Sequence, residues 1–143
     1  MFSNDLKEWQ KIEREFASKL MKRDVSKIEF SQGKFKDYDI KATFKRIWWD
    51  VEKTFEIKND MVSDRTWNVW FEYTFNWEPS GIYTSKADYI VYKLWDDFYY
   101  VDRARLLVWL SKVEKQDILW WDNNLSWMFL VKKEFFNAMA KKV

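Results

Sequence analysis

The sequence predicts an α+β or mixed α/β fold, with a mixed central sheet of about five or six strands flanked by helices. Apolar side chains repeat every three to four positions over residues 5–22, which is the period of a helix with one buried face. From about residue 26 to 75 the period becomes two, as in strands. Helical spacing returns at 103–115 and 132–142. This order of elements is typical of helices packed on a sheet.

The chain length and composition indicate one folded domain over residues 1–143. A chain of 143 residues can bury a core of its own, and two Gly and one Pro leave no stretch that resembles a linker. The net charge of +2 predicts no strong general attraction to nucleic acid. A polyanion would therefore have to be bound by a local basic patch.

The absence of Cys and His restricts the chemistry open to this protein. It excludes thiol nucleophiles, Cys/His zinc sites and histidine general bases, so catalysis would depend on carboxylates, lysine, hydroxyls and hard metal ions such as Mg²⁺. No apolar run approaches the roughly 20 residues of a membrane span. We therefore expect no membrane partner, and the lack of Cys is consistent with a cytoplasmic location.

The first predicted helix carries an acid among its apolar residues. Leu6, Trp9, Phe16 and Leu20 recur on one face, and Glu13 falls in the middle of this stripe. A carboxylate that faces a core is costly unless it is paired or binds a metal ion. Glu13 could therefore point toward a site, or it could lie at the edge of the stripe with its head in water.

Four strands are predicted in the period-two region, at 26–31, 37–46, 51–58 and 67–76. Because side chains alternate across a strand, Asp39, Glu56 and Glu72 would each extend from the face opposite the apolar residues of their strands. Lys58 shares the face of Glu56, about 7 Å further along the strand. Three consecutive strands would thus supply acids to one polar face. The alternative is a solvated sheet face with cross-strand acid–lysine pairs.

The second half of the chain is predicted to contain, in order, a turn at 78–81, a short helical turn capped by Thr84, a hairpin of 89–94 and 98–102, a helix at 103–115, a loop at 122–124, a strand at 126–131 and a helix at 132–142. Carboxylates and a lysine on the polar face suit metal-assisted hydrolysis of a phosphodiester. The carboxylates would hold Mg²⁺, and the lysine would orient the attacking water.

The order of these acids resembles the PD-(D/E)xK nuclease superfamily, which includes archaeal Holliday-junction resolvases and restriction endonucleases. The resemblance rests on Glu13, on Asp39 and on Glu56-Ile57-Lys58, and it covers roughly residues 6–94. The stretch SGIYTSKADY at 80–89, after Glu72-Tyr73, is similar to a block of small phage and bacterial members. The departure is Tyr38, where the motif name has proline.

The resemblance implies a restriction-endonuclease-like core and a role for each acid. Asp39, Glu56 and the Ile57 carbonyl would hold Mg²⁺ or Mn²⁺, and Lys58 would position or activate the water. Glu13 would support that metal or bind a second one. Glu72 would be an accessory acid, with a cross-strand pairing to Lys58 or Lys41 as the alternative.

Basic and hydroxyl side chains near these acids are candidate phosphate contacts. They are Lys34, Lys36 and Lys41 around the aspartate strand, and Ser80, Thr84 and Lys86 at the predicted helical turn. The alternatives are surface solvation for the lysines and a simple turn with an N-cap for the others. Trp48-Trp49 could stack on bases, although packing or a dimer interface is the more ordinary role of such a pair.

Taken with the resemblance, the sequence predicts a Mg²⁺-dependent DNA endonuclease, structure-selective or weakly sequence-specific, from a phage, an archaeal virus or a mobile element. Resolvase relatives act as dimers, and cutting two strands needs two sites, so we expect a homodimer in the host cytoplasm. Three other interpretations stay open: a non-catalytic nucleic-acid-binding module of the same fold, a Trp-rich protein-interaction domain, and an enzyme that acts on another substrate with the same metal chemistry.

Overall fold

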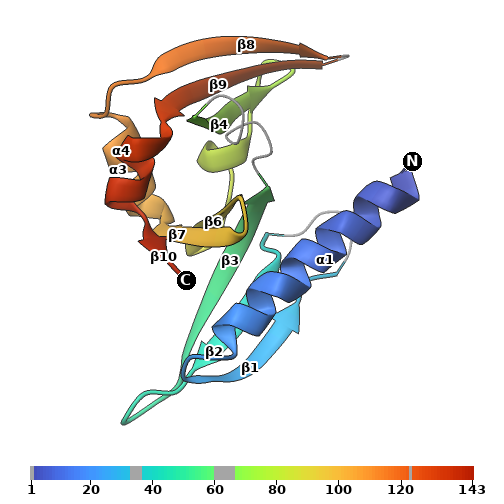
Figure 1. Cartoon of the computed structure of the whole chain (residues 1–143), viewed down its shortest axis with the longest axis vertical. Helices are drawn as coiled ribbons and strands as arrows, with labels where there is room; N and C mark the ends of the chain where they lie inside the picture. Colours follow the sequence, from blue (N-terminus) through green and yellow to red (C-terminus); the bar gives the residue numbers. More distant parts are fainter. Residues whose placement is uncertain (1, 33–36, 60–66, 123) are drawn as a thin grey trace.

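A mixed six-stranded sheet forms the centre of the computed structural model, which describes residues 2–32, 37–59, 67–122 and 124–143 (Figure 1). In sheet order its strands are β1 (Val25–Phe30), β2 (Ile40–Phe44), β3 (Val51–Asn59), β6 (Tyr89–Leu94), β7 (Asp97–Asp102) and β10 (Lys141–Lys142). The first three form an antiparallel meander, and β3 pairs with β6 in parallel. The prediction of a mixed central sheet is confirmed.

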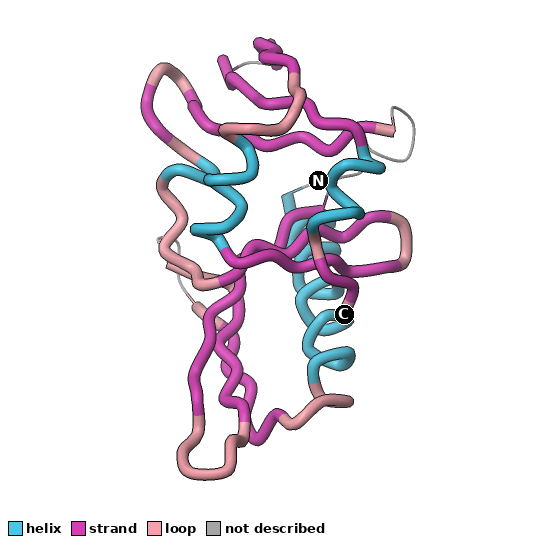
Figure 2. The backbone as a smooth tube through the Cα atoms, turned by 90° about the vertical axis from the view of Figure 1, so that its left-hand side faces the viewer, coloured by secondary structure: helices cyan, strands magenta, loops and turns pink. Residues whose placement is uncertain are grey.

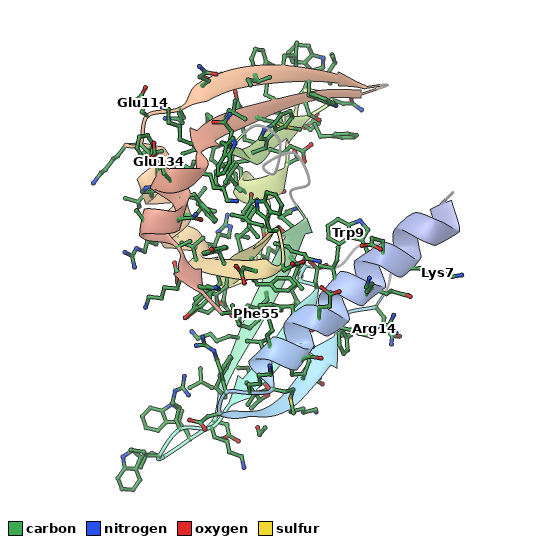
Figure 3. The ribbon with its side chains drawn as sticks, in the orientation of Figure 1. Lys7, Trp9, Arg14, Phe55, Glu114 and Glu134 are labelled. Atoms are coloured by element: carbon green, nitrogen blue, oxygen red, sulfur yellow. The ribbon has the colours of Figure 1, made fainter. Side chains whose placement is uncertain are left out.

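Helix α1 (Phe2–Leu20) covers one face of the sheet across β1, β2 and β3 (Figure 1). Its buried side chains are Ile12, Phe16, Ala17 and Leu20, whose spacing places them on one side of the helix. They join the sheet residues Ile40, Ala42, Phe55, Ile57, Val91 and Phe98 in one apolar cluster. Phe55 lies on β3 next to α1 (Figure 3). Its ring is edge-on to that of Phe16, with centroids 5.4 Å apart.

A second, four-stranded antiparallel sheet lies apart from the first (Figure 2). Its order is β5 (Glu78–Pro79), β4 (Asn68–Phe75), β9 (Asn124–Lys132) and β8 (Gln116–Asp122). The prediction that the strand at 67–76 shares the sheet of β2 and β3 is therefore wrong. A period of two identifies a strand and its buried face but not its partner, and β4 pairs with β9, which comes much later in the chain.

The second core lies between the two sheets. Helices α3 (Arg103–Leu110) and α4 (Lys133–Met139) close it, and its fully buried residues include Phe71 of β4, Ile90 of β6 and Phe136 of α4. On β6, Val91 points into the core under α1, whereas its neighbour Ile90 points into the core between the two sheets. Strand β6 is thus buried on both faces, which fits its apolar sequence YIVYKL.

Several boundaries differ from the prediction for local reasons. The helix predicted at 103–115 ends at Leu110, and residues 116–122 form β8, which the sequence interpretation did not include. The helix predicted at 132–142 gives way to β10. Thr84 does not begin a helical turn but ends the 3₁₀ helix η1 (Gly81–Tyr83). None of the described helices has the length and apolar character needed to cross a membrane.

Candidate functional site

Asp39 binds the backbone of the neighbouring strand. It lies just before β2, where its N–H donates to the Phe55 carbonyl (2.9 Å), and its Oδ2 accepts a hydrogen bond from the Ile57 N–H (2.7 Å). The regular β2–β3 pairing ends at Ile40 and Phe55. The Asp39 carboxylate therefore accepts the hydrogen bond from the Ile57 N–H that a backbone carbonyl would accept if β2 were longer.

Glu56 and Lys58 flank Ile57 on the opposite face of β3 from Phe55. Phe55 and Ile57 are buried under α1 (3% and 2% exposed), so alternation directs Glu56 and Lys58 away from that helix. Lys58 Nζ lies 3.5 Å from Glu56 Oε2. Among the described residues, this buried carboxylate oxygen has no hydrogen-bond partner. The Lys58 ammonium offsets part of the cost of burying this oxygen, and a bound cation would offset more of it.

The Ile57 carbonyl points toward the same edge as Asp39. The N–H and C=O of one strand residue point to the same side, and the Ile57 N–H meets Asp39. The carbonyl therefore also points to the β2 side, beyond the last regular β2–β3 pair. Asp39, Glu56 and Lys58 thus lie around the backbone of one residue, Ile57.

The 80–88 segment connects the second sheet to β6 and lies against this region. Asp88 Oδ2 accepts hydrogen bonds from the Thr54 N–H (2.9 Å) and hydroxyl (3.1 Å), and the Asp88 N–H donates to the Thr54 hydroxyl (2.9 Å). Lys86 Nζ lies 3.9 Å from Asp37. The segment therefore contacts both β3 and the residues before β2. Asp88 lies within the motif at 80–89, but no role was predicted for it from the sequence. No role was predicted for Asp37 or Thr54.

Gly81 brings the start of this segment close to β4. Its φ is +57°, and a Cβ at this position would collide with the Glu72 carbonyl. The preceding Ser80 has a buried hydroxyl that is without a hydrogen-bond partner in the described part of the chain, and it does not cap η1. The Thr84 hydroxyl donates back to the Gly81 carbonyl (3.4 Å), a contact within the turn.

Glu13 does not complete a three-acid site. Within the described ranges, no three acidic side chains gather closely enough to hold one metal ion. The centre of the buried stripe of α1 is Ile12 and Phe16, so Glu13 lies half-buried at its margin. On the same helix, Glu15 pairs with Lys93 of β6 at 3.0 Å.

Glu72 belongs to the second sheet and not to the polar face of β3. Its Oε1 accepts a hydrogen bond from the Ser126 hydroxyl of β9 (2.9 Å). Both expectations for this residue, an accessory acid on the same polar face and a partner of Lys58 or Lys41, followed from the wrong sheet assignment. Its contact shows a cross-strand role within β4 and β9.

The predicted phosphate contacts separate into three groups. Lys34 and Lys36 lie outside the described residues. Lys41 is half-buried, lies 3.8 Å from Glu29 of β1 and approaches the Tyr38 ring. Lys86 has a side chain that is 74% exposed and remains available near Asp37.

Two carboxylates and a backbone carbonyl are the kinds of oxygen donor that a hard divalent cation takes. Mg²⁺ is commonly bound by one or two carboxylates, with water and phosphate oxygens in its other positions. Asp39, Glu56 and the Ile57 carbonyl would supply such a set, and the buried oxygen of Glu56 is the observation that favours it. Such a site would hold one ion with two acids.

No protein-family model, curated protein or solved structure gives a significant match to this chain.

Proposed function

We propose that this protein is a Mg²⁺- or Mn²⁺-dependent nuclease that hydrolyses phosphodiester bonds in DNA. The observation that carries the proposal is the arrangement around Ile57. Asp39 is fixed by the Ile57 N–H, Glu56 has a buried oxygen without a hydrogen-bond donor in the described chain, and Lys58 lies 3.5 Å from that oxygen. The order of elements, with three antiparallel strands after a helix and a parallel β6, supports it.

Each residue would have a separate task. Asp39 and Glu56 would hold the cation, and the Ile57 amide keeps the Asp39 carboxylate turned toward β3. The cation would supply charge neutralisation at the scissile phosphate and a more acidic bound water. Lys58, whose side chain is 37% exposed, would orient that water or stabilise the developing negative charge.

Substrate selection would come from surfaces beyond the acids. The β2–β3 turn exposes Ile47, Trp48 and Trp49 (91%, 84% and 67%) at the far end of the hairpin from Asp39. Exposed indoles can stack on unpaired bases. Selection by DNA structure, with weak sequence preference, is consistent with this turn, and a homodimer would provide the two sites that a double-strand cut requires.

A cleavage assay tests the proposal. Supercoiled plasmid and a four-way junction are each incubated with the protein and Mg²⁺, Mn²⁺ or excess EDTA. We expect metal-dependent cutting of at least one substrate. Glu56→Gln and Lys58→Met should each reduce it by about 100-fold or more, because they remove groups that act on the reacting charge.

Glu52→Gln is the matched control, since Glu52 lies on the same strand and face but is exposed and away from Ile57. It should leave cleavage unchanged. Cutting that persists in Glu56→Gln would show a contaminating nuclease or another site. No cutting of any substrate, with metal-independent DNA binding, would favour the non-catalytic module of the same fold.

The exposed indoles support the second candidate, a protein-interaction domain. Trp67, Trp77 and Trp95 are each more than half exposed, and all three have positive φ. Bulky residues adopt this conformation at a cost and are found in it at functional positions. If the protein neither cuts nor binds nucleic acid, this interpretation gains support.

A further inference from the structure

A pocket of about 490 Å³ lies on the opposite side of the main sheet from the candidate metal site. Leu20, at the end of α1, and Phe55 contribute to its lining, and both belong to the core under that helix. Phe55 and Glu56 are adjacent on β3 and therefore point to opposite faces. The pocket is thus separate from the Asp39–Glu56 region and is not used by the proposed nuclease chemistry.

Four cationic side chains line this pocket. Lys22 and Arg23 follow α1, Arg46 follows β2, and Lys53 lies on β3. One acidic side chain, Asp24, is also in the lining, so the side chains leave an excess of three positive charges. Val143 lines the pocket as well, and a carboxylate on it would lower this excess by one.

The four pocket cations differ in their partners from three other lysines of the main sheet. Lys93, Lys58 and Lys41 each lie within 4 Å of a glutamate. By contrast, no ion pair of the described residues includes the four pocket cations. Arg23 donates to the Lys142 carbonyl (3.5 Å), and Arg46 donates to the Lys45 carbonyl (2.9 Å). Their charge is therefore available to an anion.

The wall of the pocket is aromatic. Phe44, Tyr89 and Tyr100 are half-buried lining residues, and Arg46 lies over the Phe44 ring at 5.5 Å. Tyr89 stacks on the buried Phe55 with centroids 5.3 Å apart and meets Tyr100 edge-on. A flat apolar wall next to a cationic rim matches a ligand that joins a planar ring to a phosphate.

We propose that this pocket binds a nucleoside phosphate, either as a free mononucleotide or as the 5′-phosphorylated end of a strand. The volume lies within the roughly 300–1,000 Å³ of small-molecule sites, which admits one nucleotide but not a duplex. The phosphate would meet Arg46 and Lys53, and the base would lie on the aromatic wall. The inference goes beyond the proposed nuclease activity and does not depend on it.

Isothermal titration calorimetry in EDTA tests whether the pocket binds a nucleoside phosphate, because chelation removes metal-dependent binding at the Asp39–Glu56 face of the sheet. The probes are adenosine 5′-monophosphate, adenosine, inorganic phosphate, and one short oligonucleotide with and without a 5′-phosphate. We expect the monophosphate to bind more tightly than adenosine or phosphate. Arg46→Ala and Lys53→Ala should each weaken it by about tenfold, the usual effect of losing one hydrogen bond to a charged group.

Lys45→Ala is the matched control, because Lys45 is an exposed cation next to Arg46 that does not line the pocket. It should leave the affinity unchanged, and so should Glu56→Gln on the other face. Tighter binding of the phosphorylated oligonucleotide than of the monophosphate would identify a strand end as the source, and the reverse order a free nucleotide. Inorganic phosphate or adenosine binding as tightly as the monophosphate, an equal loss in Lys45→Ala, or no binding by a folded protein would overturn the proposal.

Discussion

Substitution of Asp39 by asparagine and by alanine separates its structural contact from its proposed chemistry. The Asp39 Oδ2 accepts from the half-buried Ile57 N–H at 2.7 Å. Hydrogen bonds to charged groups contribute about 1.5–3 kcal/mol, and partial solvent access favours the lower part of this range. Asp39→Ala should therefore lower the free energy of unfolding by about 1.5–2 kcal/mol.

Urea unfolding followed by circular dichroism measures this effect. With a slope of about 2 kcal/mol/M, the midpoint of Asp39→Ala should fall by about 1 M. An asparagine can accept the same bond through its amide oxygen, so Asp39→Asn should stay within about 1 kcal/mol of the original protein.

The same asparagine should abolish cleavage, because it removes the charge that would hold the cation. A metal ion supplies several kcal/mol of transition-state stabilisation, so the rate should fall by at least about 100-fold. Wild-type stability in Asp39→Ala would refute the structural part of this reasoning. Undiminished cleavage by Asp39→Asn would refute the chemical part.

Three further predictions concern the 80–88 segment and the second sheet. Gly81→Ala should lower the free energy of unfolding by more than about 2 kcal/mol in a urea titration. The reasons are that a Cβ would collide with the Glu72 carbonyl and that φ is +57°. An unchanged urea midpoint would contradict the close approach of Gly81 to β4. Asp88→Ala should lower the free energy of unfolding by about 1–2 kcal/mol and speed amide hydrogen exchange in β3, since it removes the two hydrogen bonds that Thr54 donates to Asp88. Faster exchange in other strands but not in β3 would contradict this prediction. Burial, with the hydrogen bond to Asp117, raises the pKa of Tyr73 to about 12 from its usual 10, so its contribution to stability is complete below pH 10 and is lost as the pH rises to about 12. Between pH 10 and pH 12, the urea midpoint should therefore fall less in Tyr73→Phe than in the original protein. Parallel curves of midpoint against pH for the two proteins would refute this prediction.

Local alternation was enough to predict the strand faces of β2 and β3 but not the arrangement of the sheets. The period of two in β2 and β3 correctly placed Glu56 and Lys58 on the face away from Phe55 and Ile57. The same rule predicted the burial of Val69 and Phe71 in β4, yet Glu72 was assigned to the wrong sheet. Pairing partners are set by contacts across long stretches of chain, which alternation within one strand does not encode.

The first helix shows a second kind of error. Leu6, Trp9, Glu13, Phe16 and Leu20 have helical spacing, and so do the residues actually buried around Phe16. Both sets of residues form a stripe along one side of the helix. They differ by a rotation about the helix axis, and the helix sequence alone does not determine which stripe faces the sheet. The choice of Trp9 over Ile12 as a core residue placed Glu13 at the centre of the buried face. In the structure Ile12 is buried and Trp9 is 41% exposed.

The block at 80–89 has a physical explanation in the contacts of its own residues. Gly81 permits the approach to β4, and Asp88 binds Thr54 two residues before Glu56. Lys86 reaches Asp37, two residues before Asp39. The segment is therefore anchored beside both strands that carry the candidate acids. An exposed strand face would solvate Glu56 fully, whereas here one of its carboxylate oxygens is buried. The burial of this oxygen would strengthen its interaction with a cation, because charges attract more strongly where water is excluded.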